Sequence, residues 1–250
     1  MRSSQSESPR CHSKRAPLSP AGWRGEKKEV CSDAMTESAA LTQGSMTQDG
    51  FWLFAYGSLM ARPALPWTQR VEATLPGYER RFWQGSHDHR GVPGAPGRVL
   101  TLVPTEGAPD ERDERAERGE GACEGLLYFL PPAVAKGALA RLDYREKNGY
   151  LRCTREVRDR FGIRRRALVY LATPDNPAWL GPAPWAELVA QLCTAQGPSG
   201  RNIDYLRALH RTLRQLRITD PHIEALMAAA GRHLNPAGTL TTARPPKEEP

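Results

Sequence analysis

The sequence predicts an α+β fold in which a mixed or antiparallel, barrel-like β-sheet is flanked by helices. Segments typical of strands, short and either apolar or alternating, fill the part of the chain up to residue 172, with one helical segment among them. Segments of helical length and period follow in the last part. Because strands and helices do not alternate regularly, a doubly wound parallel sheet fits less well.

The first strand, residues 52–56, is aromatic and aliphatic and ends abruptly in Gly57-Ser58. Glycine tolerates positive φ and close approach of the backbone, so we expect a sharp turn here. Such a turn leaves successive N–H groups unpaired, and they could converge on a carboxylate or a polarised carbonyl oxygen. On this pattern alone, a strand that merely ends in a tight turn is an equally open interpretation.

The remaining elements follow from the same periodicities. Further strands are expected at residues 71–75, 98–103, 123–130, 150–157 and 167–172, and helices at 132–143, 185–196, 203–216 and 220–233. Residues 79–97 are rich in Arg, Gly, His and Pro, which indicates a loop. A loop this polar is costly to hold unless it lines a site, so we expect it to do so.

The domain organisation follows from composition. Residues 1–50 lack sustained periodicity and are predicted to be a disordered leader, as are residues 236–250 at the other end. One domain of ordinary size, residues 51–235, lies between them. Within it, residues 105–121 are crowded with charges and are expected to be a solvated insertion.

The formal net charge of +7 raises the question of nucleic acid. Arg164, Arg165 and Arg166 form the only tight basic run, and no aromatic residues are interleaved with it as in single-strand binders. A solvated strand end or turn is the favoured interpretation, so no nucleic-acid partner is predicted. No apolar run approaches the roughly 18 residues of a membrane span, so no membrane partner is predicted either. The sequence carries no signal for an oligomeric state.

The five cysteines are odd in number and far apart, and no C-x-x-C pair is present among Cys11, Cys31, Cys123, Cys153 and Cys193. This pattern argues against a disulfide framework and a zinc site and predicts a reducing, cytoplasmic location. His87 and His89 have no third ligand at metal-binding spacing. The P-loop, G-x-G-x-x-G and G-x-S-x-G motifs are all missing, so no cofactor or metal is predicted.

Glu146 stands out among the acidic residues. It follows the first predicted helix, precedes the Asn148-Gly149 turn and lies between Tyr144 and Tyr150. It is therefore a candidate catalytic acid–base. The alternative is that it belongs to a solvated, charged face together with its two basic neighbours.

Several strings resemble the ChaC family of glutathione-specific γ-glutamylcyclotransferases, in order along residues 52–227. The strings are Tyr56 to Leu59 (YGSL), Arg81 to Ser86 (RFWQGS), Asp88 to Gly91 (DHRG), Pro96 to Val99 (PGRV), Arg145 to Tyr150 (REKNGY), Asn176-Pro177, Leu180 to Pro184 (LGPAP) and Gly197 to Asn202 (GPSGRN). The leader, the charged insertion and the tail depart from the resemblance.

The resemblance implies a mixed β-barrel flanked by helices that cleaves glutathione to 5-oxoproline and Cys-Gly without a cofactor. In that reaction the α-amino group of the γ-glutamyl unit attacks its own γ-carbonyl. The family's catalytic glutamate falls on Glu146, whose pKa Tyr144 and Tyr150 are expected to raise by burial. Two alternatives stay open: a cyclotransferase acting on other γ-glutamyl amines or amino acids, and a non-catalytic binding protein of the same fold.

The resemblance also assigns substrate binding. The family's substrate-cradling loop falls on Tyr56, Gly57, Ser58 and Leu59. We add Arg81, Arg90 and Arg98 as our own candidates for contacting the carboxylates of a doubly anionic substrate.

Overall fold

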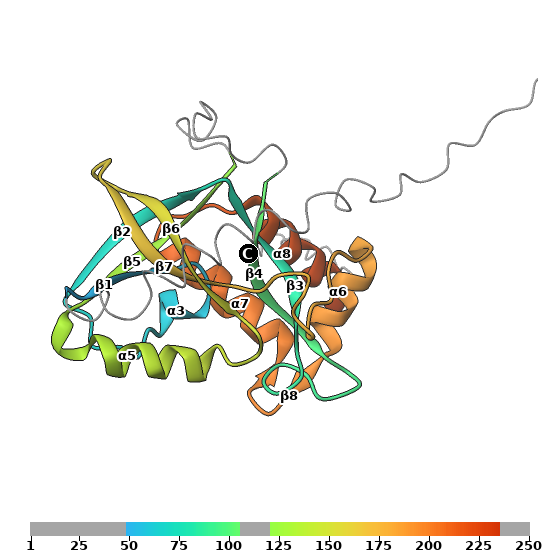
Figure 1. Cartoon of the computed structure of the whole chain (residues 1–250). Coiled ribbons are helices and arrows are strands. Elements are labelled where there is room, and N and C mark those ends of the chain that lie inside the picture. The colour runs from blue at the N-terminus through green and yellow to red at the C-terminus, as the bar shows by residue number, and fades with distance from the viewer. Residues whose placement is uncertain (1–48, 106–120, 236–250) are drawn as a thin grey trace, which may run out of the picture.

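The computed structural model describes residues 49–105 and 121–235. Except for residues 49 and 50, the predicted leader lies outside these residues, as do the tail 236–250 and residues 106–120 of the charged insertion. Figure 1 shows a barrel on one side of the molecule and a group of helices on the other.

Five strands close into a barrel. In the order of their pairing they are β1 (Phe51–Ala55), β5 (Ala122–Leu130), β2 (Gln69–Pro76), β6 (Leu151–Asp159) and β7 (Arg164–Leu171). Every neighbouring pair is antiparallel except β1 and β7, which run parallel and close the ring. One face of the closed sheet carries fully buried side chains such as Phe54, Leu127, Val157 and Val169. The predicted mixed, barrel-like sheet is thus confirmed.

A separate long hairpin joins the barrel to the helices. It consists of β3 (Tyr78–Ser86) and β4 (Gly97–Pro104). The prediction of a loop throughout 79–97 was therefore wrong for its first half. Alternate residues of β3 are buried, but Arg80 and Gln84 are among them, and these polar side chains hide the apolar alternation that identifies a strand.

The helices form two groups. The short α3 (Ser58–Ala61) follows β1 directly, and α5 (Pro132–Arg145) runs along the lower side of the barrel (Figure 1). The others, α6 (Trp185–Thr194), α7 (Asn202–Gln215) and α8 (Pro221–Leu234), pack together beside β3 and β4, with the small hairpin β8 (Gln196–Gly197) and β9 (Gly200–Arg201) between α6 and α7. No helix in residues 49–105 and 121–235 is long and apolar enough to span a bilayer.

The strand directions bring two segments that are distant in the sequence to the same end of the barrel. β1 and β7 run parallel, so the end of β1 at Ala55 lies next to the end of β7. Leu171 at that end pairs with Leu151 at the start of β6, which follows α5 within a few residues. The turn after β1 and the end of α5 therefore meet at one end of the barrel.

Candidate active site

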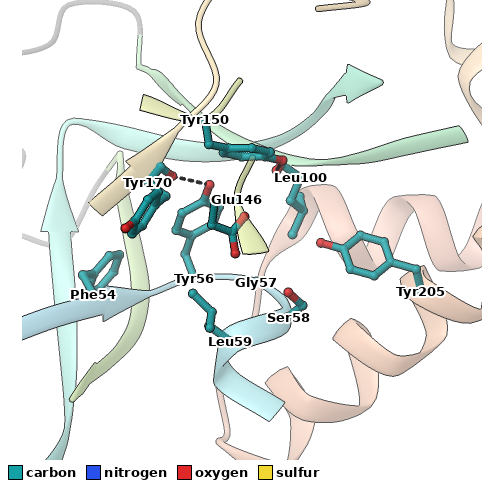
Figure 2. Close-up of a pocket in the computed structure, with 10 residues that line it drawn as sticks. All are labelled: Phe54, Tyr56, Gly57, Ser58, Leu59, Leu100, Glu146, Tyr150, Tyr170 and Tyr205. Atoms are coloured by element: carbon teal, nitrogen blue, oxygen red, sulfur yellow. Dashed lines mark hydrogen bonds between the residues drawn. The ribbon is translucent and has the colours of Figure 1, made fainter. Parts of the chain in front are cut away.

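A pocket opens where these segments meet. Its volume is about 390 Å³, including the solvent at its open mouth. Its lining comes from β1 and the turn after it, from β4, from the end of α5, from β7 and from α7: Phe54, Tyr56, Gly57, Ser58, Leu59, Leu100, Glu146, Tyr150, Tyr170 and Tyr205. Figure 2 shows the carboxylate of Glu146 directed into the space between Tyr56, Ser58 and Tyr205.

Tyr56 is fixed at both ends. Its hydroxyl donates to the backbone oxygen of Tyr170 at 2.7 Å (Figure 2), and its own carbonyl accepts from Nε of the buried Arg80 at 2.8 Å. Arg80 in turn pairs with Asp220 at 3.0 Å, and that carboxylate caps the start of α8. The backbone that leads into the Gly57-Ser58 turn is thus held by an ion pair that reaches across to the helices.

Gly57 does not have the positive φ expected from the sequence. Its φ is −132°, and its carbonyl accepts from the N–H of Met60 at 2.9 Å, which opens α3. A Cβ placed on Gly57 would lie 3.5 Å from the hydroxyl of Tyr205 and 3.7 Å from Cδ1 of Leu100. Both of those residues line the pocket, so the absence of a side chain at Gly57 leaves space there. N–H groups in the first turn of a helix lack intrahelical acceptors, which leaves the start of α3 able to donate to a ligand.

Glu146 occupies the C-terminal cap of α5, where its N–H donates to the carbonyl of Leu142 at 2.8 Å. Its side chain keeps only 17% of its surface exposed. Burial raises the pKa of the carboxyl group above its ordinary value, and the neighbouring Arg145 opposes that rise. The expected contribution of Tyr144 to this burial was wrong, because Tyr144 is 74% exposed, whereas Tyr150 does line the pocket.

Arg145 connects the carboxylate to the turn. One guanidinium nitrogen donates to Oγ of Ser58 and another to the carbonyl of Arg62, each at 3.0 Å. Its Nε lies 3.5 Å from Oε1 of Glu146. A planar guanidinium with several donors in fixed directions can hold both groups in one relative position.

Phenol rings form much of the pocket wall. The hydroxyl of Tyr150 donates to the carbonyl of Leu100 at 2.5 Å, and that of Tyr170 donates to Oδ1 of Asp143 at 2.6 Å. Burial is the largest cause that raises the pKa of Tyr205, to about 12, so the neutral phenol persists at physiological pH. Tyr170 and Tyr205 were not predicted from the sequence. Tyr170 lies in a strand and Tyr205 in a helix whose sequence patterns show which residues are apolar. Those patterns do not show which residue of the element faces the pocket.

The three predicted arginines do not line the pocket. Arg98 is buried and donates to the carbonyls of Phe82 and Gly181 and to Oε1 of Gln191, at 2.6 to 2.9 Å. Arg81 pairs with Glu79 at 2.5 Å. Arg90 contacts a residue of the pocket lining, since its guanidinium lies 5.8 Å from the centre of the Tyr205 ring.

The arrangement defines a class of site. A half-buried carboxylate with a raised pKa faces a helix-opening turn and several neutral phenols within one open hollow, which are the parts of a proton-transfer site for a small polar molecule. The chain belongs to the ChaC-like protein family, whose family model matches residues 51–233.

Curated relatives agree with the family. The glutathione-specific gamma-glutamylcyclotransferase of Saccharomyces cerevisiae is 32% identical over 231 residues, which cover 75% of this chain and 100% of the yeast protein. The glutathione-specific gamma-glutamylcyclotransferase 1 of Homo sapiens is 34% identical over 211 residues, 81% of this chain and 88% of the human protein. A crystal structure of the glutathione-specific yeast enzyme superposes with a TM-score of 0.65 at 31% identity, covering 74% of this chain and 97% of that one.

Proposed function

We propose that this protein cleaves glutathione to 5-oxoproline and Cys-Gly. The observation that carries the proposal is the Glu146 carboxylate, whose pKa is raised by burial, facing the Gly57-Ser58 turn in a pocket. The relatives that this chain matches over most of their length are named for this activity. Glutathione is accordingly the proposed substrate.

The chemistry needs little more than position and a proton carrier. The α-amino nitrogen of the γ-glutamyl unit forms a bond to its own γ-carbonyl carbon, and the bond from that carbon to the cysteine nitrogen breaks. The five-membered ring closes within one molecule, so holding the reacting atoms together supplies much of the rate. No cofactor is required, because the nucleophile belongs to the substrate.

Glu146 has the proposed role of general base and then general acid. It takes a proton from the attacking ammonium group and returns it to the nitrogen of the leaving Cys-Gly. A carboxyl group is most effective in both directions when its pKa approaches the working pH, and burial shifts the pKa of Glu146 in that direction.

The backbone after Tyr56 has the proposed role of holding the γ-glutamyl part. N–H groups of Gly57, Ser58 and Leu59 at the start of α3 suit a carboxylate or the oxygen that becomes negative during attack. Of the three arginines, Arg90 is our candidate for a substrate carboxylate, because its guanidinium lies 5.8 Å from the ring centre of the pocket residue Tyr205 and makes one exposed hydrogen bond, to the carbonyl of Arg201 at 3.2 Å. Arg81 pairs with a carboxylate and Arg98 donates to three protein acceptors, so we do not propose these two as substrate ligands.

The test is product analysis. Purified protein is incubated with glutathione and, separately, with γ-glutamyl-alanine, and 5-oxoproline and the released amine are measured by mass spectrometry. We expect 5-oxoproline and Cys-Gly from glutathione and little turnover of the second compound. Preference for γ-glutamyl-alanine would favour the alternative cyclotransferase, and no product from either would favour a binding protein. The cytoplasmic location stays a prediction, consistent with the free cysteines Cys123, Cys153 and Cys193.

A further inference from the structure

The turn between β6 and β7 exposes two large apolar side chains. Phe161 keeps 72% of its surface exposed and Ile163 keeps 50%. A Cβ placed on Gly162 between them would meet no atom within 4 Å, so the turn projects into open space. In Figure 1 this hairpin, drawn in yellow at the upper left, extends beyond the rest of the barrel.

Arginines surround this turn. Residues 156–166 contain five arginines and two acids, a net charge of +3. Arg158 lies directly opposite Arg164 in the ladder, a placement of like charges that destabilises a strand pair. Arg164 is also paired with Glu156 at 3.2 Å, whereas Arg158 and Arg166 have no ion-pair partner among residues 49–105 and 121–235. The like-charge pair would be relieved by an anion at the hairpin.

The shape of the turn favours one kind of partner. Apolar side chains on a projecting tip can be buried only in a partner that deforms around them. The interfacial layer of a lipid bilayer is such a partner. Anionic headgroups would meanwhile neutralise the arginines beside the tip. A single-stranded nucleic acid would need several aromatic faces for stacking of successive bases, whereas this tip offers one ring, Phe161, and the guanidinium of Arg160 lies 5.3 Å from its centre.

We propose that the tip of the β6–β7 hairpin docks reversibly on the anionic surface of a lipid bilayer. Phe161 and Ile163 enter the interfacial layer, while Arg158, Arg164 and Arg166 contact lipid phosphates. No membrane partner was predicted from the sequence because only an apolar span was sought there, whereas the exposure of a two-residue apolar tip depends on the fold.

Docking at this tip leaves the pocket open. The turn lies at the opposite end of β6 and β7 from the pairing of Leu151 with Leu171, beside which the pocket forms. Eight strand residues at about 3.3 Å each separate the two ends by roughly 25 Å. The inference therefore stands apart from the proposed enzymatic activity, and variants at the tip are expected to keep that activity.

The experiment is co-sedimentation of the full chain with vesicles. One set is phosphatidylcholine alone, and the other contains about one third phosphatidylserine. We expect wild-type protein to bind the anionic vesicles and not the neutral ones. The double variant Phe161→Ser/Ile163→Ser should bind about tenfold more weakly. The triple variant Arg158→Gln/Arg164→Gln/Arg166→Gln should bind about 100-fold more weakly, since each cation near the surface contributes about a factor of five.

A matched control removes the same charge elsewhere. Arg211→Gln/Arg214→Gln/Arg217→Gln alters three exposed arginines in the last turns of α7 and just after it, and should weaken binding only a few-fold. Replacing the hairpin arginines by lysine keeps the charge and should keep binding, which separates loss of charge from misfolding. Thermal unfolding of every variant is measured in parallel.

Three results would overturn the proposal. The first is wild-type protein that fails to sediment with anionic vesicles. The second is a control variant that loses as much binding as the hairpin arginine variant. The third is full vesicle binding by Phe161→Ser/Ile163→Ser, which would show that the tip does not enter the bilayer; if the wild type also binds a single-stranded RNA equally tightly, the hairpin is a general polyanion surface.

Discussion

Arg145 donates a hydrogen bond to Oγ of Ser58 at 3.0 Å while its Nε lies 3.5 Å from the Glu146 carboxylate. The turn after β1 and the end of α5 are far apart in the sequence, and this one side chain links them. It also places a permanent positive charge beside the candidate acid–base, where it opposes the pKa rise caused by burial. Arg145 is therefore suited to a positioning role.

Replacing Arg145 by Met should change the pH profile as well as the rate. Without the guanidinium, the pKa of Glu146 rises further, and a base must be deprotonated to act, so the acidic limb of kcat/KM moves to higher pH. Loss of the bond to Ser58 should cost about tenfold or more in kcat/KM at the optimum. Glutathione turnover across the pH range measures both effects.

Two further variants serve as controls for Arg145→Met. Arg145→Lys keeps the charge but not the fork, so its acidic limb should lie nearer the wild type while kcat/KM stays low. Arg141→Met, on an exposed position of the same helix, should behave as wild type. An unchanged acidic limb in Arg145→Met would show that this arginine does not act on Glu146.

Gly57→Ala should fill the pocket without unfolding the protein. The added methyl group would make only ordinary contacts, at 3.5 Å and 3.7 Å, with Tyr205 and Leu100. We expect KM for glutathione to rise about tenfold or more, since a misplacement of the order of 1 Å is costly in an intramolecular reaction. Thermal unfolding of the variant is measured in parallel, so that a change in KM can be separated from a loss of folded protein.

The control for Gly57→Ala is a glycine with free space around it. A Cβ on Gly137, within α5, meets nothing within 4 Å, so Gly137→Ala should stabilise the protein by roughly 0.5–1 kcal/mol and leave KM alone. A normal KM in Gly57→Ala would mean that the substrate does not approach this position.

The predicted arginines should separate into a binding residue and a structural one. Arg90→Met should raise KM for glutathione with little change in kcat or stability, because its side chain lies over the pocket residue Tyr205. Arg98→Met should leave the buried carbonyls of Phe82 and Gly181 without their donor and lower the free energy of unfolding by about 3 kcal/mol. Kinetics and urea unfolding of both variants decide the matter, and a stable Arg98→Met with a raised KM would reverse the assignment.

Most of the fold followed from sequence pattern, because its strands are continuous apolar runs or alternate and its long helices have one apolar face. The failures share a cause. β3 buries Arg80 and Gln84, and Arg98 is buried in β4, so residue type alone gave the wrong environment. Arg98 was predicted as a substrate ligand because residue type does not distinguish an arginine that donates to protein carbonyls from one that binds a substrate carboxylate.

The site was predictable in part. The segments at Tyr56 to Leu59 and at Glu146 were identified through motif resemblance, and the structure brings them into one pocket. Tyr205 and Leu100 could not be found in this way, because their facing the pocket depends on how α7 and β4 pack across the barrel end. The exposure of Tyr144 was likewise decided by the final turn of α5 and not by its neighbours in the sequence.

Glu146→Gln should separate activity from stability. Glutamine keeps the size of the side chain but cannot take the ammonium proton, so kcat should fall about 10²–10⁴-fold while glutathione affinity, measured by calorimetry, stays within a few-fold. The same change should stabilise the fold at neutral pH. Because burial raises the pKa of Glu146 in the folded protein, the folded state holds its proton more tightly than the unfolded chain does, and stability falls as pH rises through that interval.

The pH dependence identifies the cause of that stabilisation. Below the ordinary carboxyl pKa of 4.5, the group is protonated in both states, so the wild type and Glu146→Gln should have similar melting temperatures. Above it the wild type loses stability that the glutamine variant keeps, and the difference should grow until the pKa of the folded state is passed. Glu146→Asp serves as the control, since it retains a titrating carboxyl group but withdraws it by about one methylene, and its kcat should be nearly as low. Near wild-type kcat in Glu146→Gln would show that Glu146 is not the base of the proposed reaction. If the variant also showed no pH-dependent gain in melting temperature, the pKa of Glu146 would not be raised in the folded protein.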